Sequence, residues 1–101
     1  MDHTRKLRIL NIFVEAVEKA RASRKSVDLQ LSGTDELVGI IRAQVTFISE
    51  DRKFKLHFVV GANNEVAAYG PKGPIRSSLT ADSIASAIKD EIERELGPSA
   101  P

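Results

Sequence analysis

The sequence contains no cysteine and only two histidines, His3 and His57, among its 101 residues. Without cysteine the chain has no disulfide, no thiolate nucleophile and no cysteine-ligated metal. Two histidines far apart along the chain are too few to predict a metal site, so we expect none. The absence of cysteine also suits a reducing compartment, and we expect a cytoplasmic protein.

Long apolar runs are also missing. No run approaches the roughly 20 residues that a membrane-spanning helix needs. The opening segment "MDHTRKLRIL" carries several charges and lacks the apolar stretch of a secretory signal. The formal net charge is only +1, so total charge does not predict general attraction to nucleic acid or anionic lipid. We expect a soluble protein with no membrane partner.

Catalytic and cofactor motifs are not recognisable either. The segment "GPKGPIR" contains Lys72 and Arg76 but lacks the GxxxxGK[ST] spacing of a P-loop. It predicts a rigid connector, with an anion contact as the alternative. No set of nucleophile, base and oxyanion donor stands out, so we expect neither enzyme activity nor a cofactor.

The residues that are present describe an ordinary folded domain. Hydrophobic residues make up 42% of the chain and charged residues 29%, which is a typical globular balance. The length allows one core and not two. We expect a single α+β domain over residues 1–97, followed by a flexible tail over 98–101.

Two segments show the periodicity of amphipathic helices. The first is predicted over residues 5–23, with Thr4 as its N-cap. The second is predicted to follow Thr80 as N-cap and to end at the Gly97–Pro98 stop. Their apolar positions are Leu7, Leu10, Phe13, Val14, Val17 and Ala20 in the first, and Ala81, Ile84, Ala85, Ile88, Ile92 and Leu96 in the second. The acidic run of the second helix predicts a solvated face with an Asp90–Arg94 pair.

Four segments between the helices alternate like strands. They are "SVDLQLSG", "LVGIIRAQVTFIS", "FKLHFVVG" and "EVAAYG". The breaker-rich "SGTDE" predicts the first turn, and Gly39 predicts a bulge or a bend within the second strand. "EDRK" predicts the next loop, but its register stays open. A longer loop, "ISEDRK", would pair Gln44 with His57 and Thr46 with Lys55, whereas the shorter one would pair Thr46 with His57.

The predicted order is α-β-β-β-β-α. Short turns favour an antiparallel meander. One strand face is apolar and the other polar, so both helices are expected on one face of a two-layer sandwich. The expected core contains Phe13, Val17, Val27, Leu29, Ile41, Val45, Phe47, Leu56, Phe58, Ile84, Ile88 and Ile92.

Four strands also predict the directions of the helices. An even number of antiparallel strands returns the chain so that the two helices run antiparallel. This would bring the basic first turn of the first helix, with Arg5, Lys6 and Arg8, close to the acidic end of the second. Each cluster would then offset the unfavourable position of the other against its own helix dipole.

A helix, three strands and a helix would resemble the double-stranded RNA-binding domain in topology. In that family the second helix opens with a lysine-rich segment that contacts phosphates. Here the corresponding start is "SSLTADSIAS", with an aspartate and no lysine. The chain is therefore not assigned to that family.

The polar strand positions predict an open sheet face that is available for contact. Its residues are Asp28, Gln30, Arg42, Gln44, Thr46, Lys55 and His57. Sheets that bind single-stranded nucleic acid usually carry stacking aromatics, and this face has none unless Tyr69 reaches it. Ile40, Ile48 and Val59 would lie on the same face, where they are candidates for a dimer patch.

Our leading hypothesis is a non-enzymatic protein-interaction module that self-associates as a homodimer, through the open sheet face, a sheet edge or exposed helix stripes. The alternative is a nucleic-acid-binding protein that contacts phosphates through basic residues of the first helix and the loops. The candidate phosphate contacts are Arg5, Lys6, Arg8, Arg52, Lys53, Lys72 and Arg76, together with Arg24 and Lys25.

Overall fold

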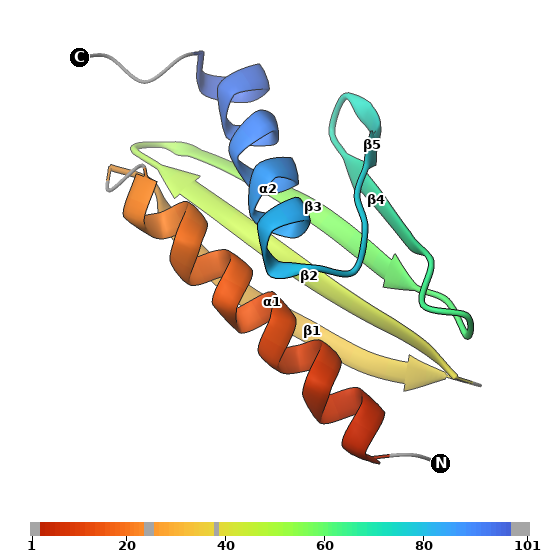
Figure 1. Cartoon of the computed structure of the whole chain (residues 1–101). Coiled ribbons are helices and arrows are strands. Elements are labelled where there is room, and N and C mark those ends of the chain that lie inside the picture. Colours follow the sequence, from red (N-terminus) through yellow and green to blue (C-terminus); the bar gives the residue numbers. More distant parts are fainter. Residues whose placement is uncertain (1–2, 24–25, 38, 98–101) are drawn as a thin grey trace.

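The computed structural model describes residues 3–23, 26–37 and 39–97 (Figure 1). The predicted tail at 98–101 and the basic residues Arg24 and Lys25 lie outside these ranges. The elements follow in the order α1 (His3–Ser23), β1 (Asp28–Leu37), β2 (Ile40–Ser49), β3 (Arg52–Val60), β4 (Val66–Gly70), β5 (Gly73–Arg76) and α2 (Ala81–Leu96).

The strands form one antiparallel sheet in the order β1-β2-β3-β4-β5. Both helices lie on the same face of this sheet, with α1 running along β1 (Figure 1). The predicted α+β sandwich with an antiparallel meander is therefore confirmed, with one strand more than predicted.

The core lies between the sheet and the helices. All of the predicted core residues are buried, and Ile9, Ala16 and Val60 join them with no exposed surface. The rings of Phe13 and Phe58 meet edge to face, with centroids 5.2 Å apart, an arrangement that aromatic quadrupoles favour. The alternation of apolar and polar residues therefore correctly predicted the buried face of β2 and β3.

The prediction for α1 was partly wrong. The helix begins at His3, so Thr4 lies within it and is not the N-cap. Its buried face is centred on Ile9, Phe13 and Ala16, whereas Leu7 and Val14 are 60% and 50% exposed. Leucine and valine can recur at helical spacing beside the buried stripe as well as within it. Only the burial seen in the structure distinguishes these two positions.

The ends of α2 confirm the capping prediction. The Thr80 hydroxyl accepts a hydrogen bond from the backbone N–H of Ser83 at 3.1 Å. At the other end Gly97 has φ of 82°, and its N–H donates to the carbonyl of Glu93 at 2.8 Å. Both contacts satisfy groups that a helix end otherwise leaves unpaired.

The predicted turn "SGTDE" is wrong, because this segment continues β1 through Leu37. A register shift between Ser32 and Asp35 accommodates it in the pairing with β2. The chain turns instead at Gly39, whose φ of 79° suits glycine. Pairing along β2 therefore outweighs the local turn preference of serine, glycine and aspartate.

The β2–β3 hairpin takes the first of the two predicted registers. Gln44 pairs with His57 and Thr46 with Lys55. The strands continue to the pair Ser49–Arg52, so only Glu50 and Asp51 form the turn. Glu50 has a positive φ of 55°, which is the conformation that tight hairpin turns require.

The segment predicted as a connector contains a fifth strand. β5 pairs with β4 from Ala67–Arg76 to Gly70–Gly73. It is an edge strand of four residues, which is the position where a proline such as Pro74 is tolerated.

The fifth strand also reverses the predicted direction of α2. An odd number of antiparallel strands makes α1 and α2 run in the same general direction, as Figure 1 shows. Lys19, near the end of α1, contacts Asp82 at the start of α2, with Nζ and Oδ1 3.1 Å apart. The predicted meeting of the basic start of α1 with the acidic end of α2 is therefore wrong.

Candidate functional site

The open sheet face lies opposite the helices. The register and the alternation of burial place on it the predicted residues Asp28, Gln30, Arg42, Gln44, Thr46, Lys55 and His57. Nε2 of Gln30 donates a hydrogen bond to Oδ2 of Asp28 at 3.2 Å, so these two side chains lie on the same face. Thr46 differs from the others because it is only 5% exposed. It pairs with Gln30 on one side and Lys55 on the other, and these longer neighbours cover it.

Tyr69 reaches this face. It pairs with His57 on β3 and with Pro74 on β5, and its side chain is 49% exposed. One row of paired residues therefore crosses the whole sheet, through Ser32, Gln44, His57, Tyr69 and Pro74. Sequence reasoning did not place Tyr69, because the register between β3 and β4 depends on the Gly61–Glu65 turn.

The charges on the open sheet face are mostly positive. Its exposed cations are Arg42, Lys53, Lys55 and Arg76. Among the residues whose side chains the structure describes, Asp28 is the acid on this face. Asp35 stands opposite Arg42 in the register. Lys53 and Arg76 were predicted as loop contacts, but pairing with Ile48 and Ala67 assigns both to this face.

The apolar residues of the open sheet face do not form a patch. Ile48 lies near the β2–β3 turn, whereas Ile40 lies at the opposite end of β2. Val59 pairs with Arg42 and is half-buried. The fold therefore separates Ile48 from the other two members of the predicted dimer patch, whereas Ile40 and Val59 are diagonal neighbours on β2 and β3.

The predicted phosphate contacts are dispersed, and several already bind the protein itself. Arg5 donates from Nη1 to the carbonyl of Gly39 at 2.9 Å and from Nη2 to that of Gly61 at 2.7 Å. It also reaches Oδ1 of Asn64 from Nε at 3.2 Å. Its guanidinium thus ties the start of α1 to two turns of the sheet. The acceptors in these turns offset the unfavourable position of Arg5 in the helix dipole.

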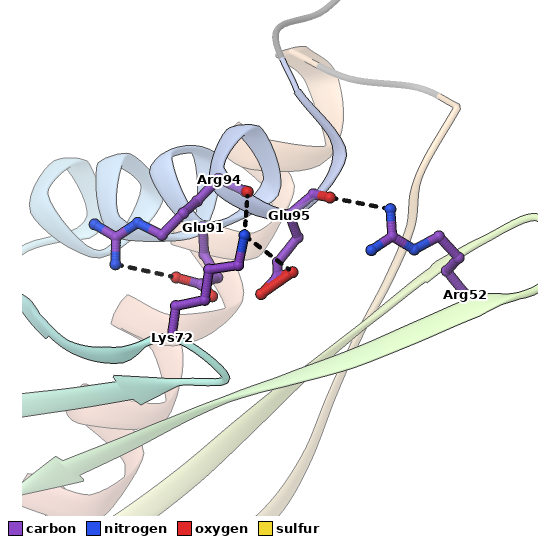
Figure 2. A network of polar contacts seen from close by, with 5 residues as sticks. All are labelled: Arg52, Lys72, Glu91, Arg94 and Glu95. Carbon is purple, nitrogen blue, oxygen red and sulfur yellow. Dashed lines mark hydrogen bonds and ion pairs between the residues drawn. The ribbon is translucent and has the colours of Figure 1, made fainter.

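A cluster of charged residues surrounds the C-terminal end of α2 (Figure 2). Arg52 donates to the carbonyl of Glu95 at 3.0 Å, and Lys72 donates to that of Arg94 at 3.1 Å. The guanidinium of Arg52 also lies over the ring of Phe54, 4.7 Å from its centroid. Both cations therefore cap the negative end of the helix dipole. Of the other predicted contacts, Lys6 is half-buried and Arg8 exposed, both on α1.

Two carboxylates within this cluster are buried, which corrects the prediction of a solvated acidic face. The side chain of Glu91 has no exposed surface, and that of Glu95 is 6% exposed. Arg94 pairs with Glu91 at 3.9 Å and Lys72 with Glu95 at 4.0 Å. Within the described residues, both oxygens of Glu91 and Oε1 of Glu95 have no hydrogen-bond partner.

Burial raises the pKa of Glu91, and the nearby carboxylate of Glu95 raises it further, while Arg94 and Lys72 oppose the shift. Gly70 on β4 makes room for this carboxyl group. A Cβ atom at position 70 would lie 2.5 Å from Oε1 of Glu91. The close approach of β4 to α2 therefore encloses a carboxyl group whose pKa lies above the ordinary glutamate value.

The outer edge of β1 is a second candidate surface. β1 has ten residues and ends the sheet on one side. Nη2 of Arg21 on α1 donates to the carbonyl of Leu29 at 2.6 Å. One side of α1 therefore lies over this edge. Leu7, Leu10 and Val14 lie on the same side as Arg21 by helical spacing, and Leu7 and Val14 are the exposed large apolar side chains of the helix.

In residues 3–23, 26–37 and 39–97 no three His, Cys, Asp or Glu side chains gather where they would hold a metal ion. Neither helix in these ranges has the length and apolar character needed to cross a bilayer. No protein-family model, curated protein or solved structure matches the chain.

Proposed function

We propose that the chain is a small non-enzymatic interaction module that self-associates as a homodimer through the outer side of α1 and β1. One observation carries the proposal: an apolar stripe of Leu7, Leu10 and Val14 adjoins a ten-residue edge strand. The absence of cysteine supports the cytoplasm as the proposed compartment.

The two edges of the sheet differ in a way that favours β1. β5 has four residues, and Pro74 offers no backbone N–H. Short strands and prolines are the usual means by which a sheet edge resists pairing. β1 is long and contains no proline. The carbonyl of Leu29 is occupied by Arg21, so we place the contact in the strand beyond Leu29.

A two-fold axis would use both features at once. Two copies of β1 would pair antiparallel and extend the sheet across the dimer, while the α1 helices would approach each other side by side. Leu7, Leu10 and Val14 of each copy would then be covered by the same residues of the other. Such a contact is isologous, the commonest arrangement in homodimers.

Light scattering coupled to gel filtration tests the proposal. We expect the protein at tens of micromolar to have twice the 11.1 kDa mass of one chain. Val14→Glu and Leu7→Glu should give the mass of one chain at the same concentration, because each places a charge in the contact. Ser86→Glu, on the exposed side of α2, is the matched control and should remain dimeric.

Two outcomes would contradict the proposal. A wild-type protein that stays at the mass of one chain over the whole concentration range would exclude self-association. A Val14→Glu protein that remains a dimer would show that the contact lies elsewhere. Circular dichroism of each variant separates loss of association from loss of folding.

A further inference from the structure

The open sheet face is more positively charged than the molecule as a whole. The net charge of the chain is only +1, yet Lys53, Lys55 and Arg76 share this one surface. Cations gathered on one face attract a polyanion even when total charge is small. One copy of the chain presents the complete face, so binding to it does not require self-association.

Two flat rings lie next to each other on this face. His57 and Tyr69 are directly opposite on β3 and β4, a position that brings Cβ atoms to about 4.5–5.5 Å. Tyr69 is half exposed and His57 is exposed. Tyrosine and histidine are both side chains on which unstacked bases lie in RNA complexes. Adjacent strands thus offer two neighbouring stacking positions.

Cations flank the two rings on both sides. Lys55 precedes His57 by two residues on the same face of β3. Arg76 follows Pro74, the partner of Tyr69, by two residues on the same face of β5. A strand of nucleic acid whose bases lie on the rings would therefore have positive charges beside its backbone. Bases held by stacking and phosphates held by cations are the general pattern of single-strand binding.

The remaining groups of the face suit a single strand of RNA better than a duplex. Gln44 lies beside His57 in the same row, and Gln30 lies one row further along β1. Their amides can donate to and accept from base edges and 2′-hydroxyl groups. In a duplex the base faces are covered by their neighbours, so the two rings would have nothing to stack on.

We propose that the open sheet face binds single-stranded RNA, with bases stacked on Tyr69 and His57 and phosphates paired with Lys55 and Arg76. Lys53 extends the positive surface along β3. Arg76 and Lys53 were also among the phosphate contacts predicted from the sequence, but the first helix and the other loop residues of that prediction are not part of this surface.

The chain provides its own optical probe for this interaction. Tyr69 is the single tyrosine, and there is no tryptophan. Protein fluorescence therefore reports on the ring in question. We expect an unlabelled single-stranded RNA of about 12 nucleotides to quench this emission as bases stack on the ring. Binding of the RNA without any change in emission would overturn the role of Tyr69.

Fluorescence anisotropy of the same RNA with an end label measures affinity. Tyr69→Ala should weaken binding by roughly 5- to 100-fold, the range of one lost stacking contact. Tyr69→Phe keeps the flat ring and should change affinity by less than about threefold. A loss in Tyr69→Phe as large as that in Tyr69→Ala would mean that stacking does not hold the RNA.

A pair of double variants decides which surface binds. Lys55→Glu/Arg76→Glu should weaken binding at least about tenfold and make the slope of log affinity against log salt less negative by about 1.4, or 0.7 for each lost phosphate contact. Lys6→Glu/Arg8→Glu makes the same change of charge on α1 and should affect both quantities little. An equal loss in the two double variants would overturn the proposal in favour of unspecific attraction.

Competing ligands complete the test. Duplex RNA of the same length and single-stranded DNA should both compete less well than the single-stranded RNA. Better competition by the duplex would exclude base stacking as the mode of binding, and better competition by the DNA would overturn the choice of RNA. No binding of any of them at low salt would leave the face as a surface for an acidic protein and refute the proposal.

Discussion

At the scale of single residues, Glu91 departs furthest from what burial normally favours. A carboxylate without exposed surface is costly unless it is paired and hydrogen-bonded. Glu91 has only Arg94 at 3.9 Å, and its oxygens have no hydrogen-bond partner within the described residues. Helical periodicity does not reveal this burial, because Glu91 belongs to a run of charged residues that resembles a solvated face.

We expect Glu91 to make the stability of the protein depend on pH. Its pKa is raised in the folded state, so the folded chain holds the proton more tightly than the unfolded chain. The free energy of unfolding should therefore fall as pH rises from the ordinary glutamate pKa through the raised value, and then level off. Glu91→Gln should abolish this fall and raise stability at neutral pH by about 1 kcal/mol.

Urea denaturation at several values between about pH 4 and pH 8 measures this effect. Wild type and Glu91→Gln should differ least at the acidic end, where the carboxyl group is protonated in both states. Glu93→Gln is the matched control, because Glu93 is exposed on the same helix. A Glu91→Gln protein that is less stable than wild type at neutral pH would show that the Arg94 pair outweighs burial.

Arg5 shows how a charge that seemed available for a partner can be used by the fold. Its guanidinium supplies donors to the carbonyls of Gly39 and Gly61. Arg5→Met should leave both acceptors without this partner and lower the free energy of unfolding by about 2 kcal/mol. Arg8→Met, an exposed position on the same helix, should have little effect. Equal urea midpoints for the two variants would contradict this role of Arg5.

At the scale of elements, the limits of a helix or strand could be predicted where contacts within that element determine them. The limits of α2 follow from Thr80 and Gly97, whose contacts reach only three or four residues along the chain. β5 and the second half of β1 were missed because each is stabilised by hydrogen bonds to a neighbouring strand, which the preferences of its own residues do not reveal. Proline and glycine in "GPIR" discourage a strand locally, but pairing with β4 supplies hydrogen bonds at an edge.

Thr80→Ala tests the local part of this account. Removing the hydroxyl leaves the N–H of Ser83 without its acceptor, and we expect a loss of about 1 kcal/mol. Ser86→Ala, within the exposed side of the same helix, should be neutral or slightly stabilising. A thermal scan of the two variants beside wild type gives the comparison. A Thr80→Ala protein with unchanged melting temperature would mean that tertiary packing alone defines the start of α2.

At the scale of the whole molecule, one unpredicted strand changed the arrangement of the layers. Five strands in place of four make the helices run in the same general direction and separate the charged ends that were expected to meet. The basic side chains have other partners in the structure. Arg5 binds two turns of the sheet, and Arg52 and Lys72 cap α2. The count of strands is a global quantity, so a single local error propagated through the topology.

The sequence by itself determined which face of each central strand is buried, because alternation along a strand needs no knowledge of its neighbours. It determined the predicted members of the open sheet face for the same reason. Only the tertiary structure decided that Tyr69 joins His57, that Glu91 is enclosed and that the stripe of Leu7 and Val14 lies uncovered beside β1. Each of these depends on register or on the packing of one element against another, which are contacts between residues far apart in the chain.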